Sequence, residues 1–450
     1  MPISKIINFG ISFLRKGKTM KLLRLYVLIY FILAGVYASA QQLTNSQVPF
    51  SYPVLAKDIG AKLKEKLSSY VEESHMRSAF LEENQVIRVL LIKDLSSIKL
   101  QHSGPIYIYT TDSNEKYKIE DGGETLLVSV KEGQINVAGI TSQKTLIIDP
   151  HISSYITFSH KKLKNNAYNG VLHFIPHNGK MMIVEYSNLE NYLLGVVGHE
   201  MNAAWPLEAL KAQTVSARTF ARVKMNKKEP NYDLRSTPAD QVYKGSAQNV
   251  PESILQAVQS TRGEVLIYNN SLFITFYHAN CGGYTVDGQV LTGSHVCTIE
   301  PLQGVVCNNC SHTYNSCWST TIPSESINQF VWEHSEIRGP ISSIKIEQTD
   351  TNPKYEAAEV KQVVSLRFIS EDNSVILNCD LLQQAMGLKK IKTCKIDKIE
   401  KNDDGFVFSG CGFGHGVGLC QDGAKGMAEN NYSYRQILSH YFPGSELVIF

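Results

Sequence analysis

Residues 187–225 constrain the fold more than any other stretch, because they indicate two helices joined at a kink. Ser187 and Glu190 have the spacing of a capping box for the first helix, and Pro206 suits the first turn of the second. At 100° per residue, Glu200 falls within the apolar stripe of the first helix, at the negative end of its dipole. Desolvation and the dipole both predict a raised pKa for the Glu200 carboxyl, as a general acid requires. The competing interpretation is an ordinary surface residue at a helix end.

Composition narrows the class of protein around this pair of helices. The chain has 450 residues, of which 43% are hydrophobic and 19% charged, as expected for one large or two ordinary globular domains. The net charge of +2 gives no general attraction to nucleic acid, so we expect no nucleic-acid partner.

The N-terminal region reads as a secretory signal. An apolar run over residues 25–38 follows Lys21 and Arg24, and Ala38-Ser39-Ala40 fits a cleavage site. We expect a signal peptide over residues 1–40, with Met20 as an alternative start, and a helical linker over 41–85. An uncleaved anchor is the alternative, although the run is shorter than the ~20 residues of a membrane span. Either way the rest of the chain is exported, to the periplasm or cell envelope.

From residue 86 the sequence pattern indicates strands, because short runs of β-forming residues are separated by glycine-containing turns. This pattern predicts strands over 87–92, 106–110, 126–130, 135–138, 145–148 and 155–159, and a hairpin over 170–186. Later segments predict a helix over 251–260, strands over 264–268 and 272–277, and a strand-rich stretch over 341–400. The predicted fold class is α+β: a strand-rich platform, a helical segment that carries Glu200, and a C-terminal glycine-rich loop with two short helices. Ser433 and Gln436 form the capping box of the last helix.

The glycine-rich loop over residues 410–418 lacks the spacing of a phosphate-binding loop, because its glycines alternate. Alternating glycines let a segment lie against another backbone or a ligand. His415 is the one large functional group in its middle, either a site residue or a structural histidine.

The chain has nine cysteines, and several gather in a loop over about 278–320. Cys307-Asn-Asn-Cys310 resembles half of a zinc knuckle, and Cys281 and Cys317 are candidates to complete a structural zinc site. Export favours disulfides equally well in this loop. Outside it, the candidate disulfide partners are Cys379, Cys394, Cys411 and Cys420. A third interpretation is a cysteine nucleophile, which would be either Cys411 or Cys281 with its neighbour His278. No residue that would orient the base is evident for either cysteine.

Four segments together resemble a known family. YLLGVVGHEMNAAWPLEALKAQTVSARTFA, QVYKG, FYHANCGGYT and GCGFGHGVGLCQDGAKGMAENNYSYRQILSHYFPGSEL look like the signature blocks of the stage II sporulation protein D (SpoIID/LytB) family, in the same order. VIRVLL at 86–91 resembles the usual start of that domain. The resemblance therefore covers residues 86–450, which we expect to form one catalytic domain.

The resemblance implies an exported lytic transglycosylase that cleaves the β-1,4 bond between N-acetylmuramic acid and N-acetylglucosamine in peptidoglycan and leaves a 1,6-anhydro end. The implied acid is the glutamate of Glu200-Met201. One carboxyl suffices because the C6 hydroxyl of the sugar attacks the anomeric carbon, so no cofactor is required. The expected substrate contacts are Lys211, Arg218, Gln241, Tyr243, His278, His415 and Gln421. Lys211 and Arg218 are expected to grip the sugar or to hold Glu200, and a close approach would lower its pKa.

The chain also departs from the family pattern. Gly198-His199 stands where Pro-Ser is usual before the glutamate, and residues 226–246 lack the His and Cys through which some members bind zinc. Some relatives are described as amidase enhancers. The alternative function is therefore a peptidoglycan-binding protein that stimulates a separate cell-wall amidase.

Overall fold

The computed structural model describes residues 85–113, 116–151, 153–227, 230–245, 248–289, 299–311, 316–349 and 360–450. The expected signal peptide, the linker up to residue 84, and Cys297 lie outside the described residues. Among the described helices, none is both long and apolar enough to cross a membrane. The mixed, strand-rich α+β class predicted from the sequence is confirmed.

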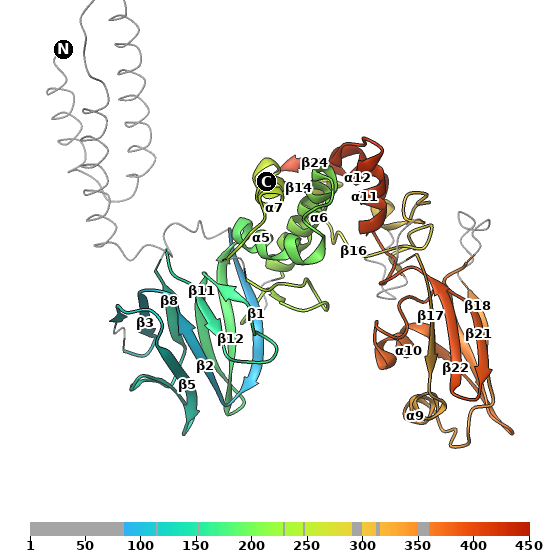
Figure 1. Cartoon of the computed structure of the whole chain (residues 1–450), viewed down its shortest axis with the longest axis horizontal. Helices are drawn as coiled ribbons and strands as arrows, with labels where there is room; N and C mark the ends of the chain where they lie inside the picture. Colours follow the sequence, from blue (N-terminus) through green and yellow to red (C-terminus); the bar gives the residue numbers. More distant parts are fainter. Residues whose placement is uncertain are drawn as a thin grey trace, which may run out of the picture. The chain divides into compact units, whose positions relative to one another are not determined.

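Two largely antiparallel sheets form the predicted platform (Figure 1). The first has seven strands, in the order β13 (Leu234–Arg235), β1 (Val86–Leu95), β12 (Lys180–Asn188), β11 (Val171–His177), β8 (Leu146–Pro150), β3 (Ile106–Thr110) and β4 (Lys116–Ile119). The second has six, in the order β10 (Ala167–Tyr168), β9 (Ile156–Phe158), β2 (Ser97–His102), β5 (Thr125–Lys131), β6 (Gln134–Val137) and β7 (Ile140–Ser142). Apolar side chains from both sheets share one buried core, which also includes residues of the helical segment.

The hairpin of β11 and β12 leads directly into the helical segment. His177 pairs with Lys180 across a two-residue turn of Asn178 and Gly179, both with positive φ. Such a turn matches the twist of paired strands, which is why Asn-Gly is a strong hairpin signal. β12 ends at Asn188 and the first helix starts at the next residue.

The helical segment and the C-terminal helices share a second core. It contains α5 (Leu189–Glu200), α6 (Leu207–Met225), α7 (Glu252–Ser260), α11 (Gln421–Glu429) and α12 (Tyr434–Tyr441). Two small sheets and a short helix complete this region. The first sheet has the order β15 (Ser271–Leu272), β14 (Glu264–Tyr268) and β24 (Glu446–Ile449), the second pairs β16 (Tyr277–His278) with β23 (Leu419–Cys420), and the helix is η3 (Glu300–Leu302). The predicted helix over 251–260, the strand over 264–268 and the capping box of Ser433 and Gln436 are confirmed. The strand predicted over 272–277 is wrong, because only its two end residues lie in strands.

A third core belongs to a module within residues 317–411. Its elements are β17 (Cys317–Ile322), α9 (Ser324–His334), β18 (Ser343–Thr349), β19 (Val363–Ile369), β20 (Ser374–Asn378), α10 (Cys379–Met386), β21 (Ile396–Asn402) and β22 (Gly405–Cys411). Strands were predicted for much of this region, whereas α9 and α10 were not. Disulfides join Cys317 to Cys411 and Cys379 to Cys394.

Candidate functional site

Helix α5 presents Glu200 at its C-terminal end. The helix starts one residue later than expected: Asn188 is the N-cap, and its side chain accepts a hydrogen bond from the N–H of Glu190 at 2.9 Å. Ser187 cannot be the cap, because its backbone is still paired with Ile87 of β1. Gly195 lies in the middle of α5, where a Cβ would come within 2.5 Å of the carbonyl oxygen of Gly245. A glycine there lets the 241–245 segment pack directly on the helix.

The carboxyl of Glu200 is half-buried and accepts hydrogen bonds from that packed segment. Its Oε1 accepts from the N–H of Val242 at 2.9 Å and from the hydroxyl of Tyr277 at 3.5 Å. Burial raises the pKa of Glu200, while the Val242, Gln421 and Tyr277 donors act in the opposite direction. The predicted upward shift of the pKa is therefore confirmed, with desolvation as its leading cause.

Gln421 and Tyr277 complete the immediate surroundings of Glu200. Gln421 was expected in the site, and its side-chain amide lies near enough to Glu200 to lower its pKa. The Nε2 atom of Gln421 is nevertheless buried without a partner at full hydrogen-bonding geometry. Tyr277 was missed, although it precedes His278 in the FYHANCGG segment. Neighbouring residues of a strand point to opposite sides, so only one of these two side chains can face Glu200. His278 was expected there from the sequence, whereas Tyr277 contacts the Glu200 carboxyl.

Two other expected substrate contacts, Gln241 and Tyr243, are buried side chains. Gln241 is completely buried, where it accepts a hydrogen bond from the Tyr192 hydroxyl at 2.9 Å and donates one to the Ala217 carbonyl at 3.2 Å. Tyr243 is 2% exposed, and its ring packs on that of Tyr192 at 4.8 Å between centroids. Direct substrate contact by either side chain is contradicted by this burial. Both residues support the loop and helix that hold Glu200.

The two histidines form a pair in which His278, on β16, is buried and His415 is half-buried. His278 Nδ1 donates to the Val417 carbonyl at 3.0 Å, and His415 Nδ1 accepts from the Val417 N–H at 3.1 Å. Their ring centroids are 5.4 Å apart. Burial lowers the pKa of His415 to about 4 and that of His278 well below its usual value. Both rings are therefore neutral near pH 7. They fix the glycine-rich loop against β16, and a Cβ on Gly414 would lie only 2.8 Å from that of His278.

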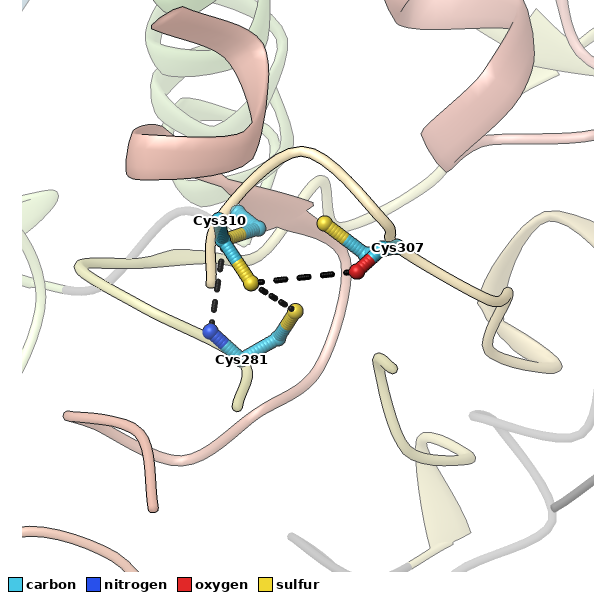
Figure 2. Close-up of side chains that lie close together, drawn as sticks. Cys281, Cys307 and Cys310 are labelled. Carbon is cyan, nitrogen blue, oxygen red and sulfur yellow. Dashed lines mark hydrogen bonds between the residues drawn. The ribbon is translucent and has the colours of Figure 1, made fainter. Parts of the chain in front are cut away.

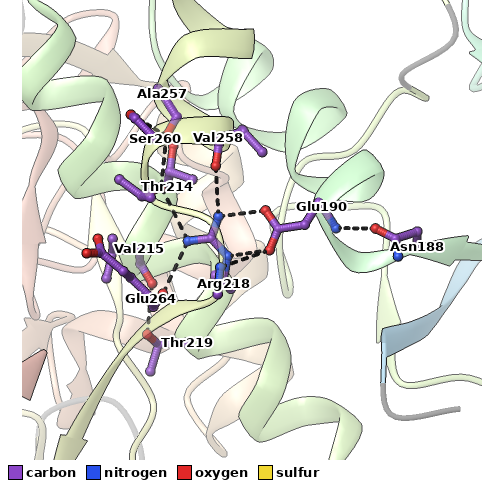
Figure 3. Close-up of polar contacts among 12 residues, drawn as sticks. Asn188, Glu190, Thr214, Val215, Arg218, Thr219, Ala257, Val258, Ser260 and Glu264 are labelled. Atoms are coloured by element: carbon purple, nitrogen blue, oxygen red, sulfur yellow. Dashed lines mark hydrogen bonds and ion pairs between the residues drawn. The ribbon is translucent and has the colours of Figure 1, made fainter. Parts of the chain in front are cut away.

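The prediction that Arg218 contacts substrate or holds Glu200 is wrong. Figure 3 shows its guanidinium directed at Glu190, at the opposite end of α5 from Glu200. Nη2 and Nε of Arg218 donate to the two carboxylate oxygens of Glu190 at 2.7 and 2.8 Å, and Nη1 donates to the Glu264 carbonyl at 3.2 Å. The side chain is completely buried, because α6 turns this face toward α5 and α7. Arg218 is a structural residue.

Lys211 is also held elsewhere. Its Nζ donates to Glu208 Oε1 at 2.7 Å, one helical turn away, and lies 5.5 Å from the centroid of the Tyr434 ring. Within the described chain, neither Lys211 nor Arg218 is among the groups that shift the pKa of Glu200. The basic residues therefore leave the raised pKa intact.

The cysteines fall into two groups that differ from the expected ones. Cys317 is not part of a metal site with Cys281, because it is bonded to Cys411 where β17 and β22 pair. Cys420 takes its place: the sulfur atoms of Cys281, Cys307, Cys310 and Cys420 all lie within 4.8 Å of one another, and all four residues are buried. Figure 2 shows the side chains of Cys281 and Cys310 pointing toward each other. This set of four can hold a metal ion.

Chemically, the arrangement around Glu200 provides one carboxyl that favours its protonated form. The groups that shift its pKa, within the described residues, include no cation and no second carboxyl. Such a group can donate a proton to a leaving oxygen and then accept one as a carboxylate. A surface hollow lined by Tyr432, Arg435 and His440 contains none of the residues around Glu200.

Comparison with known proteins identifies the family. The family model described as Stage II sporulation protein (SpoIID) matches residues 177–268. An uncharacterized protein of Brachyspira hyodysenteriae is 31% identical over 376 residues, which cover 82% of this chain and 94% of that protein. The amidase enhancer of Bacillus subtilis is 29% identical over 74% of this chain and 51% of its own length. Stage II sporulation protein D of Bacillus subtilis is 26% identical over 59% of this chain and 75% of its own length. The chain belongs to the SpoIID family.

The SpoIID match spans the first part of the site only. Residues 177–268 include Glu200, Val242 and the ion pair of Glu190 with Arg218. Tyr277 and Gln421, together with the four clustered cysteines, lie C-terminal to the match.

Proposed function

We propose that the chain is an exported lytic transglycosylase that cuts peptidoglycan glycan strands, with Glu200 as its single acid and base. The observation that carries the proposal is the half-buried Glu200 carboxyl, whose pKa is raised by desolvation, with no cation of the described residues acting against it. A general acid needs a group that remains protonated close to the working pH. Membership of the SpoIID family supports the same assignment.

The reaction then needs no second carboxyl and no water. Glu200 donates its proton to the glycosidic oxygen as the bond from that oxygen to C1 of N-acetylmuramic acid breaks. The C6 hydroxyl oxygen of the same sugar bonds to C1, and the Glu200 carboxylate accepts the C6 hydroxyl proton. The acid is thereby regenerated and the product carries a 1,6-anhydro ring. An ordinary glycosidase instead uses two carboxyls and adds water.

The neighbours of Glu200 have distinct roles in this scheme. The Val242 N–H and the Tyr277 hydroxyl orient the carboxyl through Oε1. The buried Nε2 of Gln421 has a donor to offer to a sugar oxygen or to the ionised carboxyl. Donors that become better engaged as charge develops lower the barrier of the reaction.

Export to the periplasm or envelope is part of the proposal. The apolar run over residues 25–38 supports it, and so do the two disulfides of the 317–411 module. Disulfides persist in oxidising compartments and are rare in the cytosol.

The second candidate is a peptidoglycan-binding protein that stimulates a cell-wall amidase. A relative named amidase enhancer favours it, although this chain covers only 51% of that protein. Under this alternative the chain binds glycan strands and the amidase, and Glu200 has no chemical task.

Digestion of purified glycan strands, freed of stem peptides, separates the two candidates. Wild type, Glu200→Gln and the control Glu208→Gln are compared by mass spectrometry of the products. The proposal predicts anhydro ends, lighter by one water than hydrolysis products, from wild type and Glu208→Gln but not from Glu200→Gln. The same digestion is repeated on intact peptidoglycan, in case stem peptides are required. Absence of anhydro ends on both substrates, with faster release of stem peptides by an added amidase, supports the enhancer instead.

A further inference from the structure

Four buried cysteines from three separate segments converge on one point. Cys281 follows strand β16, Cys307 and Cys310 stand on one tight loop, and Cys420 ends β23. Their sulfur atoms lie within 4.8 Å of one another, and those of Cys281 and Cys310 are 3.4 Å apart. The other four described cysteines pair off as disulfides in the 317–411 module. The fold thus brings together one set of four thiols that it does not cross-link.

The spacing of these sulfur atoms fits a single tetrahedral ion. Zinc binds thiolate sulfur at about 2.3 Å, so the corners of a tetrahedral four-thiolate site are about 3.8 Å apart. The observed separations bracket this value, from 3.4 Å for one pair up to the 4.8 Å limit. A disulfide requires a sulfur–sulfur distance of about 2.05 Å, which the Cys281 and Cys310 pair exceeds. Cys307 and Cys310 also have the two-residue spacing of a zinc knuckle.

The surroundings of Cys420 stabilise the negative charge of a thiolate. It is the N-cap of α11, and its sulfur accepts hydrogen bonds from the N–H groups of Cys281 and Gly423, each at 3.3 Å. The N-terminal end of a helix favours negative charge, and hydrogen bonds around a metal site orient its ligands. Gly423 also leaves room for the cluster, since a Cβ there would lie 2.6 Å from the sulfur of Cys307.

A buried cation stands beside the cluster. Lys395 is 1% exposed, and its Nζ donates to the carbonyl oxygen of Cys281 at 2.5 Å and to that of Tyr284. An isolated buried ammonium is costly unless a nearby negative charge offsets it. Zinc with four thiolates carries a net charge of −2, which gives the Lys395 ammonium a counter-charge.

We propose that Cys281, Cys307, Cys310 and Cys420 bind one structural zinc ion. A four-thiolate tetrahedral site selects zinc among the common divalent ions and leaves no coordination position open for catalysis. The ion also explains how four neighbouring thiols avoid oxidation in an exported protein, because metal-bound thiolates are withheld from disulfide formation. The set expected from the sequence contained Cys317 in place of Cys420.

The zinc ion also sets the geometry of the candidate active site. Tyr277 of β16 lies four residues before Cys281, and Gln421 directly follows Cys420. β16 and β23 pair in parallel, with His278 opposite Cys420, so the ion ties together the ends of the two strands that bring Tyr277 and Gln421 to Glu200. This consequence rests on the proposed function, whereas the metal site itself does not.

Metal content tests the site without reference to activity. Protein exported to the periplasm of a bacterial host in zinc-supplemented medium is purified without chelator, and its zinc is counted by elemental analysis. We expect about one zinc ion per chain in the wild type, and loss of that zinc in Cys307→Ser and in Cys420→Ser. The matched control is the double variant Cys379→Ser/Cys394→Ser, which removes two cysteines of the 317–411 module and keeps the zinc.

Cobalt substitution provides a second readout that needs no variant. Wild type with Co²⁺ in place of zinc is expected to show the intense visible absorption of tetrahedral cobalt with thiolate-to-metal charge transfer. This measurement decides the matter if the serine variants do not fold. The proposal is overturned if folded wild type holds no zinc and peptide mapping finds the four cysteines as disulfides, or if cobalt gives no thiolate bands. Retention of zinc by both serine variants overturns it equally.

Discussion

Helix α5 carries a carboxyl group near each end, and the two groups have opposite surroundings. Glu190, in the first turn, faces the guanidinium of the completely buried Arg218 through two hydrogen bonds of 2.7 and 2.8 Å. Among the described residues, the groups that shift the pKa of Glu200, the last residue, are the Val242 N–H, the Tyr277 hydroxyl and the Gln421 amide, and burial raises that pKa. The same residue type on one helix is thus an ion-pair partner at one end and, at the other, a carboxyl whose protonated form is favoured by burial.

The positions of the cations distinguish the two carboxyl groups, because Arg218 lies beside Glu190 and not beside Glu200. Both Lys211 and Arg218 lie on α6, one helix after Glu200, and sequence placed them near it. In the folded chain Arg218 pairs with Glu190 and Lys211 pairs with Glu208 instead. A cation beside Glu200 would favour its ionised form and remove the proton that the proposed reaction needs.

The largest expected effect on stability comes from breaking the ion pair at the start of α5. Arg218→Met leaves the Glu190 carboxylate without its buried partner, so the free energy of unfolding should fall by about 3–5 kcal/mol. Lys211→Met, on the same helix, removes a partly exposed pair with Glu208 and should cost less than about 1 kcal/mol. Chemical denaturation of the two variants measures both. Equal losses would show that the two cations are not as different as their burial implies.

Glu200→Gln should have the opposite effect on stability. Because folding raises the pKa of Glu200, the protonated carboxyl is stabilising below its unfolded-state pKa, and this contribution is lost as pH rises through the folded-state value. A neutral glutamine avoids the loss, so the variant should melt at a higher temperature than wild type near pH 7. The gain should shrink as pH falls below about 4, where Glu200 is mostly protonated in the folded and the unfolded chain alike. Thermal melts across this range give the sign, and destabilisation at pH 7 would contradict the raised pKa.

A smaller effect is expected from the neutral donors around Glu200. Gln421→Ala and Tyr277→Phe each remove one neutral hydrogen-bonding group, so we expect kcat/KM to fall about tenfold, which corresponds to about 1.4 kcal/mol. Tyr192→Phe, which removes the hydroxyl bonded to Gln241, serves as a control one layer farther from the carboxyl. A larger loss from the control than from the two site variants would place the important donors elsewhere.

The sequence predicted the parts of this site that depend on local chemistry. The Asn-Gly turn, the helix that ends at Glu200, Pro206 before α6 and the capping box of α12 are all features of neighbouring residues. The apolar stripe around Glu200 likewise suffices to predict the direction of its pKa shift.

The errors concern partners that only the tertiary fold selects. The partner of Arg218 lies 28 residues earlier in the chain, and Cys420 joins Cys281 across 139 residues. Because Cys317 is nearer than Cys420 to the other three cysteines along the chain, it was expected in the cluster. The pairing of β17 with β22 instead places Cys317 against Cys411. Tyr243 and Gln241 were expected to touch substrate because they stand in a signature segment, yet packing on α5 buries both.

Under the proposed function Glu200, and not Glu190, performs the chemistry. The most direct measurement is the rate at which anhydro ends form from purified glycan strands, for wild type, Glu200→Gln and Glu190→Gln, with the folded fraction of each determined by circular dichroism. We expect a loss of about 10²–10⁴-fold per folded molecule in Glu200→Gln, the usual contribution of a general acid, and a near-normal rate per folded molecule in Glu190→Gln. Anhydro ends formed by Glu200→Gln at the wild-type rate would show that Glu200 is not the acid.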